Sequence, residues 1–216
     1  MKVLSFNVGV WTRNCKCSDP NYWRPRMELM RLMIEEQQPD VICFQELWFP
    51  ASTYIPDNYK KVVGSGLEHP IYVRRGLVVG QRSFHIHWSM AQVEGYYIFS
   101  IHGHWDRKKT EKLFADIHEC INKLSKNQEP SCILTGDYNV EWNELKELAS
   151  PLLNIREVLN QERQITYMHF VDNTRVGEID HFLYCNCTPL SYSVFPDKEG
   201  KLRISNHYPI VAEFVD

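Results

Sequence analysis

Residues 131–140, SCILTGDYNV, constrain the fold most, because an apolar run of strand length stops abruptly at polar residues. The run CILT is typical of a buried strand and ends at Gly136. In an extended backbone, alternation places the side chains of Asp137 and Asn139 on the same side of the chain. Such strand ends carry the chemistry of open α/β sheets, and these two side chains suit a hard cation or a phosphate oxygen. From this segment alone, a strand followed by an Asp/Asn turn remains the simpler interpretation.

The remaining chain mixes helical and strand-like patterns. Apolar spacing predicts helices over 21–38, 107–127 and 141–150, with a helix or turn at 152–160. Alternating or continuous apolar runs predict strands over 2–8, 41–44, 59–64, 71–79, 83–90, 92–101, 178–184 and 210–215. We expect the four strands between 59 and 101 to form an antiparallel meander, and residues 189–200 to be mostly loop. The mixture favours an α/β fold of two sheets packed face to face, with helices outside, in a single domain over 1–216.

The composition is that of a soluble globular protein, with 44% hydrophobic and 24% charged residues. The net charge of −3 gives no overall basic field for nucleic acid, although a local basic groove remains compatible with it. The N-terminal residues read as a strand and not as a signal peptide. No run approaches the roughly 18 apolar residues of a membrane span. We therefore expect a cytoplasmic monomer without stable membrane insertion.

The seven cysteines are an odd number in a chain too long to need a disulfide framework. Two C-x-C pairs, Cys15 with Cys17 and Cys185 with Cys187, lack the C-x-x-C spacing usual in structural zinc sites. Four thiols that met in space would still form such a site. Reduced, partly buried thiols are the simpler expectation.

Several predicted strands end in polar groups of one chemical kind. Each has a structural explanation by itself, but together they make a complete set for phosphoester hydrolysis. A glutamate supplies a ligand for a hard cation, an Asp-x-Asn pair holds water and phosphate, and a histidine paired with an aspartate gives an oriented imidazole. These strand-end residues are Asn7, Glu46, His102, Asp137, Asn139, Asp180, Asn206 and His207.

Six short motifs occur in an order that resembles the endonuclease/exonuclease/phosphatase superfamily, to which deoxyribonuclease I-like metal-dependent phosphoesterases belong. The motifs cover nearly the whole chain, and six in sequence are far more specific than any one of them. They are SFNV with Asn7, PDVICFQEL with Glu46, SIH with His102, GDYN with Asp137 and Asn139, IDHF with Asp180, and SNHYPI with His207.

The resemblance implies a four-layer α/β sandwich of two mainly antiparallel sheets and a dependence on Mg²⁺ or Mn²⁺. It implies that Glu46 is the principal metal ligand, with Asn7 and Asn206 beside it. It further implies that Asp137 orients or deprotonates the attacking water and that Asn139 helps to hold water and phosphate. His207, paired with Asp180, would bind the scissile phosphate, and His102 would add a second phosphate contact.

One position departs from the family pattern, which has Asp where this chain has Asn206. An amide oxygen can still bind a cation, but it lacks the negative charge. This raises the alternative of a catalytically impaired binding module.

For an active enzyme, two classes of substrate remain open. The first is nucleic acid, cut by a nuclease; the second is a phosphorylated small molecule or a lipid phosphate. Basic residues could contact backbone phosphates and support the first class; they are Lys60, Lys61, Arg74, Arg75, Arg107, Lys108 and Lys109. Three tryptophans near motif ends could stack on bases, with core packing as the alternative; they are Trp11, Trp48 and Trp105.

Overall fold

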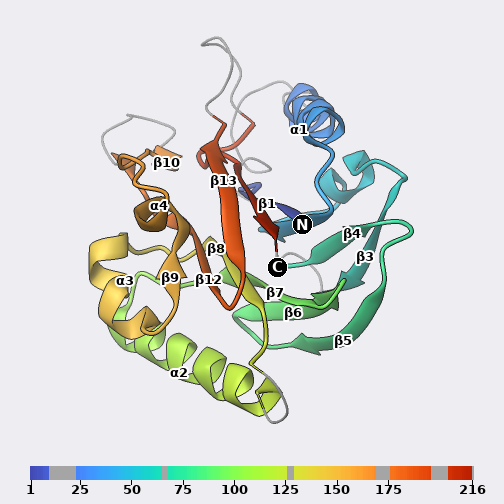
Figure 1. Ribbon diagram of the computed structural model, residues 1–216. Coiled ribbons are helices and arrows are strands. Elements are labelled where there is room, and N and C mark those ends of the chain that lie inside the picture. The colour runs from blue at the N-terminus through green and yellow to red at the C-terminus, as the bar shows by residue number, and fades with distance from the viewer. Residues whose placement is uncertain (10–22, 65–67, 126–128, 169–175, 196–203, 216) are drawn as a thin grey trace.

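Two six-stranded sheets form the centre of the fold (Figure 1). The computed structural model describes residues 1–9, 23–64, 68–125, 129–168, 176–195 and 204–215. In each sheet one pair of neighbouring strands is parallel and the other pairs are antiparallel. The predicted α/β fold with two mainly antiparallel sheets is therefore confirmed.

The first sheet contains the N-terminal and C-terminal strands, with β1 and β2 as its parallel pair. Its strands in spatial order are β13 (Thr188–Val194), β14 (Ile210–Val215), β1 (Lys2–Asn7), β2 (Val41–Gln45), β4 (Ile71–Arg74) and β3 (Tyr59–Val63).

The second sheet contains the middle of the chain, with β7 and β8 as its parallel pair. Its strands in spatial order are β5 (Val79–Phe84), β6 (Trp88–Val93), β7 (Tyr96–His102), β8 (Cys132–Asp137), β12 (Asp180–Cys185) and β9 (Leu153–Asn154). A separate two-stranded ribbon pairs β10 (Tyr167–Met168) with β11 (Val176–Gly177).

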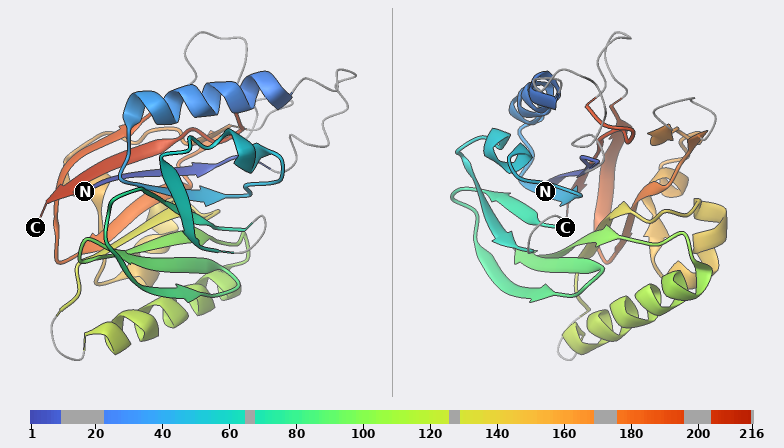
Figure 2. Two further views of the ribbon diagram at one scale, coloured as in Figure 1. Left: turned by 90° about the vertical axis from the view of Figure 1, so that its right-hand side faces the viewer. Right: turned by 180° about the vertical axis from the view of Figure 1, so that it is seen from behind.

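Helices cover the outer faces of both sheets. The left view of Figure 2 shows α1 along one side and α2 along the other, with the two sheets between them. The helices are α1 (Trp23–Gln37), η2 (Ala51–Tyr54), α2 (Arg107–Leu124), α3 (Trp142–Ala149) and α4 (Ile155–Val158). This arrangement confirms the four-layer sandwich.

Strand β2 shows why its sequence is apolar throughout. Successive side chains of a strand point to opposite faces, and both faces of β2 are covered. Val41 and Cys43 join the core between the sheets, whereas Ile42 and Phe44 join the core beneath α1. The methionines of α1 lie in that second core, as their helical spacing predicts.

The strand pairing brings distant polar residues to one end of the two sheets. In the parallel pair of the first sheet, Asn7 is the register partner of Gln45. In the second sheet, Asp137 lies opposite His102 on one side and Asp180 on the other. The sheet ends therefore position the predicted site before any side-chain contact is considered.

Three predictions about strands were wrong. The strands between residues 59 and 101 do not form one meander, because β3 and β4 belong to the first sheet and β5, β6 and β7 to the second. The predicted strand 71–79 breaks after Arg74, where the chain turns at Gly76 with a φ of 99° and crosses between sheets. Residues 189–194, predicted as loop, belong to the strand β13, which pairs with β14.

Parts of two further predictions lie outside the described residues. Helix α1 is described from Trp23, so the predicted start at residue 21 is not tested. Cys15 and Cys17 also lie outside, so the alternative of a four-thiol zinc site stays untested. None of the described helices is long and apolar enough to cross a membrane.

Candidate active site

The carboxylate of Asp137, at the end of β8, is the centre of the site. One oxygen, Oδ2, lies 2.9 Å from Asn7 Nδ2, 3.6 Å from His207 Nε2 and 3.9 Å from His102 Nε2. The other oxygen, Oδ1, accepts the backbone N–H of Asn139 at 2.8 Å. The side chain is 2% exposed, so four polar groups surround a carboxylate that is almost removed from water.

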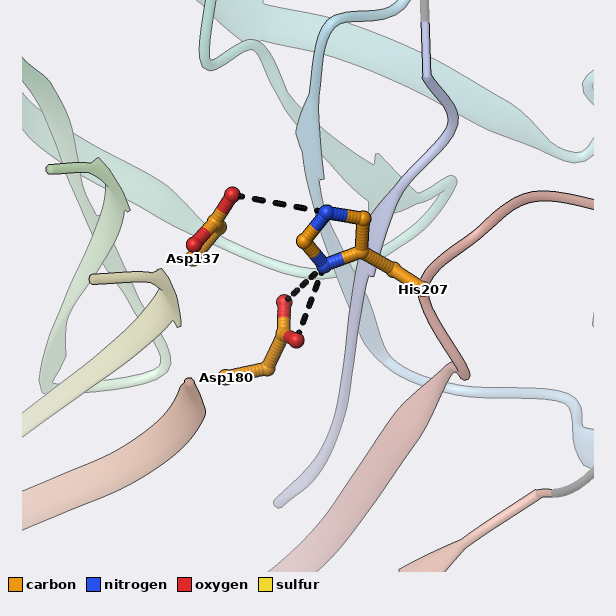
Figure 3. Close-up of side chains that lie close together, drawn as sticks. All are labelled: Asp137, Asp180 and His207. Carbon is orange, nitrogen blue, oxygen red and sulfur yellow. Dashed lines mark hydrogen bonds and ion pairs between the residues drawn. The ribbon is translucent and has the colours of Figure 1, made fainter. Parts of the chain in front are cut away.

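His207 forms a hydrogen-bonded pair with Asp180, as the sequence predicts. Its Nδ1 lies 2.9 and 3.2 Å from the two oxygens of Asp180, while its Nε2 faces Asp137, as Figure 3 shows. The pair is held in place from both sides. The backbone N–H of His207 donates to Ser205 Oγ at 3.2 Å, and that of Asp180 donates to Thr166 Oγ1 at 3.0 Å.

The charges of these groups depend on one another. Burial by itself lowers the pKa of His207, but the carboxylates of Asp180 and Asp137 outweigh burial and raise it to about 9. Burial raises the pKa of Asp137, against the attraction of His207. At neutral pH the site therefore contains an imidazolium that lies between two carboxyl groups.

Glu46 lies beside this group, directly after β2, and its backbone adopts a left-handed conformation with a φ of 53°. Asn7 Nδ2 lies within hydrogen-bond distance of Glu46 Oε1, at 3.3 Å, as well as of Asp137. The backbone N–H of Glu46 donates to the carbonyl of Glu68 at 3.0 Å. A non-glycine residue in this conformation costs roughly 1–3 kcal/mol, and such strain is concentrated at functional sites.

His102, at the end of β7, lies between two glutamates. Its Nε2 is 3.6 Å from Glu46 Oε1, and its Nδ1 is 3.6 Å from Glu68 Oε2. Both ring nitrogens of His102 therefore face carboxylates.

Two glycines allow the strands to approach closely enough to form the site. A Cβ on Gly136, whose φ is 149°, would lie 2.0 Å from the carbonyl oxygen of Ile101 on the parallel strand. A Cβ on Gly103 would lie 2.4 Å from the carbonyl oxygen of Tyr138. Asn139 Nδ2 donates to the Gly103 carbonyl at 3.2 Å, which joins the loops after β7 and β8. Larger residues at either glycine would force these loops apart.

The donor set suits a hard divalent cation. Glu46 Oε1 and Asp137 Oδ2 both lie within reach of one amide nitrogen, so two carboxylates from different sheets converge where a positive charge would be stabilised. Asp137, Asp180 and His207 also offer three ligand atoms within 4.8 Å of one another. We favour the Glu46–Asp137 side, because a protonated His207 has no lone pair for a metal.

Asn7 differs in detail from the sequence expectation. Its oxygen accepts the backbone N–H of Gly9 at 2.9 Å, which directs its nitrogen toward the two carboxylates. In this orientation Asn7 positions the carboxylates, and its predicted role as a metal ligand stays a prediction. Asn206, the other predicted amide ligand, is next to His207 in the chain, with its Oδ1 3.2 Å from Ser205 Oγ.

The structure thus brings together the residues that the strand-end motifs predict. The connected set, each member within 4 Å of at least one other, contains Asn7, Glu46, His102, Asp137, Asn139, Asp180 and His207.

The sequence analysis missed three residues that contribute to the site: Glu68, Thr166 and Gln45. Gln45 has a signal in the sequence, since it is a polar residue inside an apolar run. It is fully buried and its Nε2 donates to Ser100 Oγ of the other sheet at 3.2 Å.

The tryptophans near the motif ends have different environments. Trp48 is buried with its ring 5.2 Å from that of Trp23, so core packing explains it and the base-stacking prediction is wrong there. Trp105, just after β7, is 70% exposed, and Trp11 lies outside the described residues.

Comparison with known proteins gives a match between residues 14–207 and the model of the Endonuclease/Exonuclease/phosphatase family. No curated protein sequence matches the chain. Among solved structures, D. rerio TDP2 complexed with a single-strand DNA product is similar, with a TM-score of 0.78, 17% identity, and coverage of 100% of this chain and 99% of that chain. A truncated Caenorhabditis elegans TDP2 is also similar, with a TM-score of 0.79 and 16% identity, and the similarity covers 100% of this chain and 97% of that chain.

The mannosyl-6-phosphatase of Bacteroides thetaiotaomicron is also similar, with a TM-score of 0.77 and 17% identity, and the similarity covers 100% of both chains. At these identities the likeness concerns the fold.

Proposed function

Because the chain belongs to the endonuclease/exonuclease/phosphatase family, we propose that it is a metal-dependent phosphoesterase that hydrolyses phosphodiester bonds, those of nucleic acid first among them. The observation that carries this proposal is the buried Asp137 carboxylate, with Glu46 on one side and the His207–Asp180 pair on the other. Mg²⁺ or Mn²⁺ held by Glu46 and Asp137 would supply the positive charge that stabilises the phosphoryl group and the leaving oxygen.

The residues of the chain suit the individual steps of the hydrolysis. His207 carries an N–H on Nε2 that can bind a non-bridging oxygen of the phosphate, and Asp180 holds the ring in place. Asp137 accepts a proton from the attacking water. The water oxygen bonds to phosphorus and the ester P–O bond breaks. The leaving oxygen takes a proton from solvent, giving a phosphate monoester and an alcohol.

The positions of the basic residues argue against an extended basic surface that would contact the phosphates of duplex nucleic acid. The backbone N–H of Arg74 donates to the carbonyl of Asp40, just before β2, whereas Glu46 follows the opposite end of that strand. Arg75 lies beyond Arg74 and donates to the carbonyl of Asp57. Arg107 forms an exposed ion pair with Glu111 on α2. We therefore favour single strands, strand ends or small diesters as substrates.

A second candidate is a phosphatase that acts on a small phosphorylated molecule. The similarity to a mannosyl-6-phosphatase over the full chain supports it as much as the similarity to TDP2 supports the first candidate. The carboxylate of Glu68 beside His102 also disfavours long anionic polymers on that side of the site.

One substrate panel separates the candidates. The chain is incubated with Mg²⁺ or Mn²⁺ and plasmid, single-stranded DNA, RNA, and a set of phosphorylated small molecules. Cleavage of a nucleic acid supports the first candidate. Release of phosphate from a small molecule without any nucleic-acid cleavage would replace it with the second.

Two variants test the assigned residues. We expect Glu46→Ala and His207→Ala each to lower turnover by about 100-fold or more, the scale at which preorganised charge contributes. Leu32→Ala, at an exposed position on α1, serves as a control for expression and handling. Activity that survives both site variants would contradict the assignment.

A further inference from the structure

A pocket of 690 Å³ opens directly beside the candidate active site. His102, Gly103 and Asn139 form its wall on the side of the site, and Glu68 lies at the same wall. A phosphate held by His102 and Asn139 would therefore carry one of its ester substituents into this pocket. Its size is that of a small-molecule site.

The rest of the wall is apolar and open to solvent. Trp105, Ile86 and Phe84 line the pocket, and they are 70%, 67% and 49% exposed. Trp105 follows β7, whereas Phe84 and Ile86 come from the end of β5 and the connection to β6. Three large apolar side chains from two separate segments thus gather at one opening, and such exposed clusters mark binding surfaces.

The charge in the pocket excludes a second phosphate. Among the described residues that line it there is no lysine or arginine, and Glu68 is the one carboxylate. Two imidazoles, those of His87 and His104, complete the wall with ring centroids 4.3 Å apart. Burial lowers the pKa of both histidines, which supports their being neutral.

A smaller hollow on the other side of Trp105 fits a ring less well. It measures 240 Å³ and shares Trp105 and Asn139 with the pocket. Two carboxylates, those of Glu141 and Glu144, line it and give it a negative charge. The larger pocket is thus the better match for an apolar substituent.

We infer that the pocket lined by Phe84, Ile86 and Trp105 binds an uncharged planar ring, a nucleobase or an aryl group, carried by the ester substituent that stays on the phosphate being hydrolysed. This inference rests on the proposed function and names the substituent that the site selects. Trp105 provides the main stacking surface, because its ring is the largest and most exposed in the wall.

Two diesters with the same leaving group test the inference by kinetics. The first, p-nitrophenyl phenyl phosphate, carries a second ring, and the second, p-nitrophenyl ethyl phosphate, does not. The ratio of kcat/KM for the two substrates, compared between variants, cancels their intrinsic reactivities. We expect Trp105→Ala to lower this ratio by about tenfold, the scale of one stacking contact, and Trp105→Phe to retain most of it. Leu32→Ala is the matched control for loss of an exposed apolar side chain.

Binding provides a readout that does not need turnover. Phenylphosphonate and methylphosphonate are titrated by calorimetry into the wild-type chain and the Trp105→Ala variant, with Mn²⁺ present. We expect the phenyl compound to bind about tenfold more tightly, and Trp105→Ala to remove the difference. If neither diester is hydrolysed but this difference holds, the proposed function fails and the pocket assignment stands. Equal binding of the two phosphonates, or an unchanged kinetic ratio in Trp105→Ala, overturns the inference.

Discussion

The pair of His207 and Asp180 makes a prediction that links stability to pH. Asp180→Asn keeps the size of the side chain and removes its charge. In the folded chain His207 has a pKa of about 9, against 6.5 for an ordinary histidine. At roughly 1.4 kcal/mol per pH unit, this gap corresponds to about 3 kcal/mol, shared between Asp180 and Asp137. Because Asp180 is the closer of the two, we assign about 2 kcal/mol to it.

The sign of the effect follows from the raised pKa. Stabilisation by a protonated His207 is complete below pH 6.5 and disappears as the pH rises through 9. We therefore compare the loss of unfolding free energy caused by Asp180→Asn at two pH values. This loss, relative to the wild-type chain, should be about 2 kcal/mol larger at pH 6 than at pH 10. Titrations of groups that do not interact with this pair affect both chains equally and cancel in the difference.

The assay is urea unfolding of both chains in EDTA at pH 6, 8 and 10, with the His207 pKa followed by NMR. Asp116→Asn is a matched control, since Asp116 lies 3.7 Å from the ring of His85 in a more exposed pair. Such a pair contributes about 0–1 kcal/mol, so little pH dependence is expected. A stability difference for Asp180→Asn that is equal at pH 6 and pH 10 would refute the reasoning.

Three further predictions concern the backbone and the metal. Gly136→Ala should lower the free energy of unfolding in urea by about 2–4 kcal/mol, because its Cβ would overlap a backbone carbonyl; an unchanged midpoint would contradict the packing. Glu46→Gly should raise the free energy of unfolding by about 1 kcal/mol, because glycine adopts the left-handed backbone conformation of this position without strain. The same substitution should abolish hydrolysis, and melting and activity assays on the same variant check both effects. Asn206→Asp should lower the Mg²⁺ concentration for half-maximal activity and raise turnover, because it adds a carboxylate; an equal or weaker metal dependence would disprove this.

Much of the site could be predicted because its residues follow strong local patterns. Asp137 and Glu46 each come directly after a buried apolar run, where a carboxylate is unexpected unless it has a partner. The partners themselves are not visible locally. The pairing of Asp180 with His207 joins segments 27 residues apart, and only the order of several motifs indicated it.

The assignment of strands to sheets could not be predicted, because an alternating pattern identifies a strand without identifying its neighbour. The break after β4 had a signal in Gly76, which the apolar run around it concealed. The edge strand β13 has mostly exposed side chains, so it lacks the apolar pattern on which the prediction depends. Glu68 lies beside His102 because its carbonyl accepts the backbone N–H of Glu46. No local pattern in the sequence shows this pairing.

The central claim is that the carboxylates at the ends of β2 and β8 bind a divalent cation and support phosphodiester hydrolysis. The most direct measurement is the rate of hydrolysis of bis(p-nitrophenyl) phosphate across a titration of Mg²⁺ and of Mn²⁺, for the wild-type chain and for Glu46→Gln. We expect hydrolysis that saturates with metal, stops in EDTA, and falls by about 100-fold or more in Glu46→Gln. Hydrolysis that persists in EDTA, or that Glu46→Gln leaves unchanged, would contradict the claim.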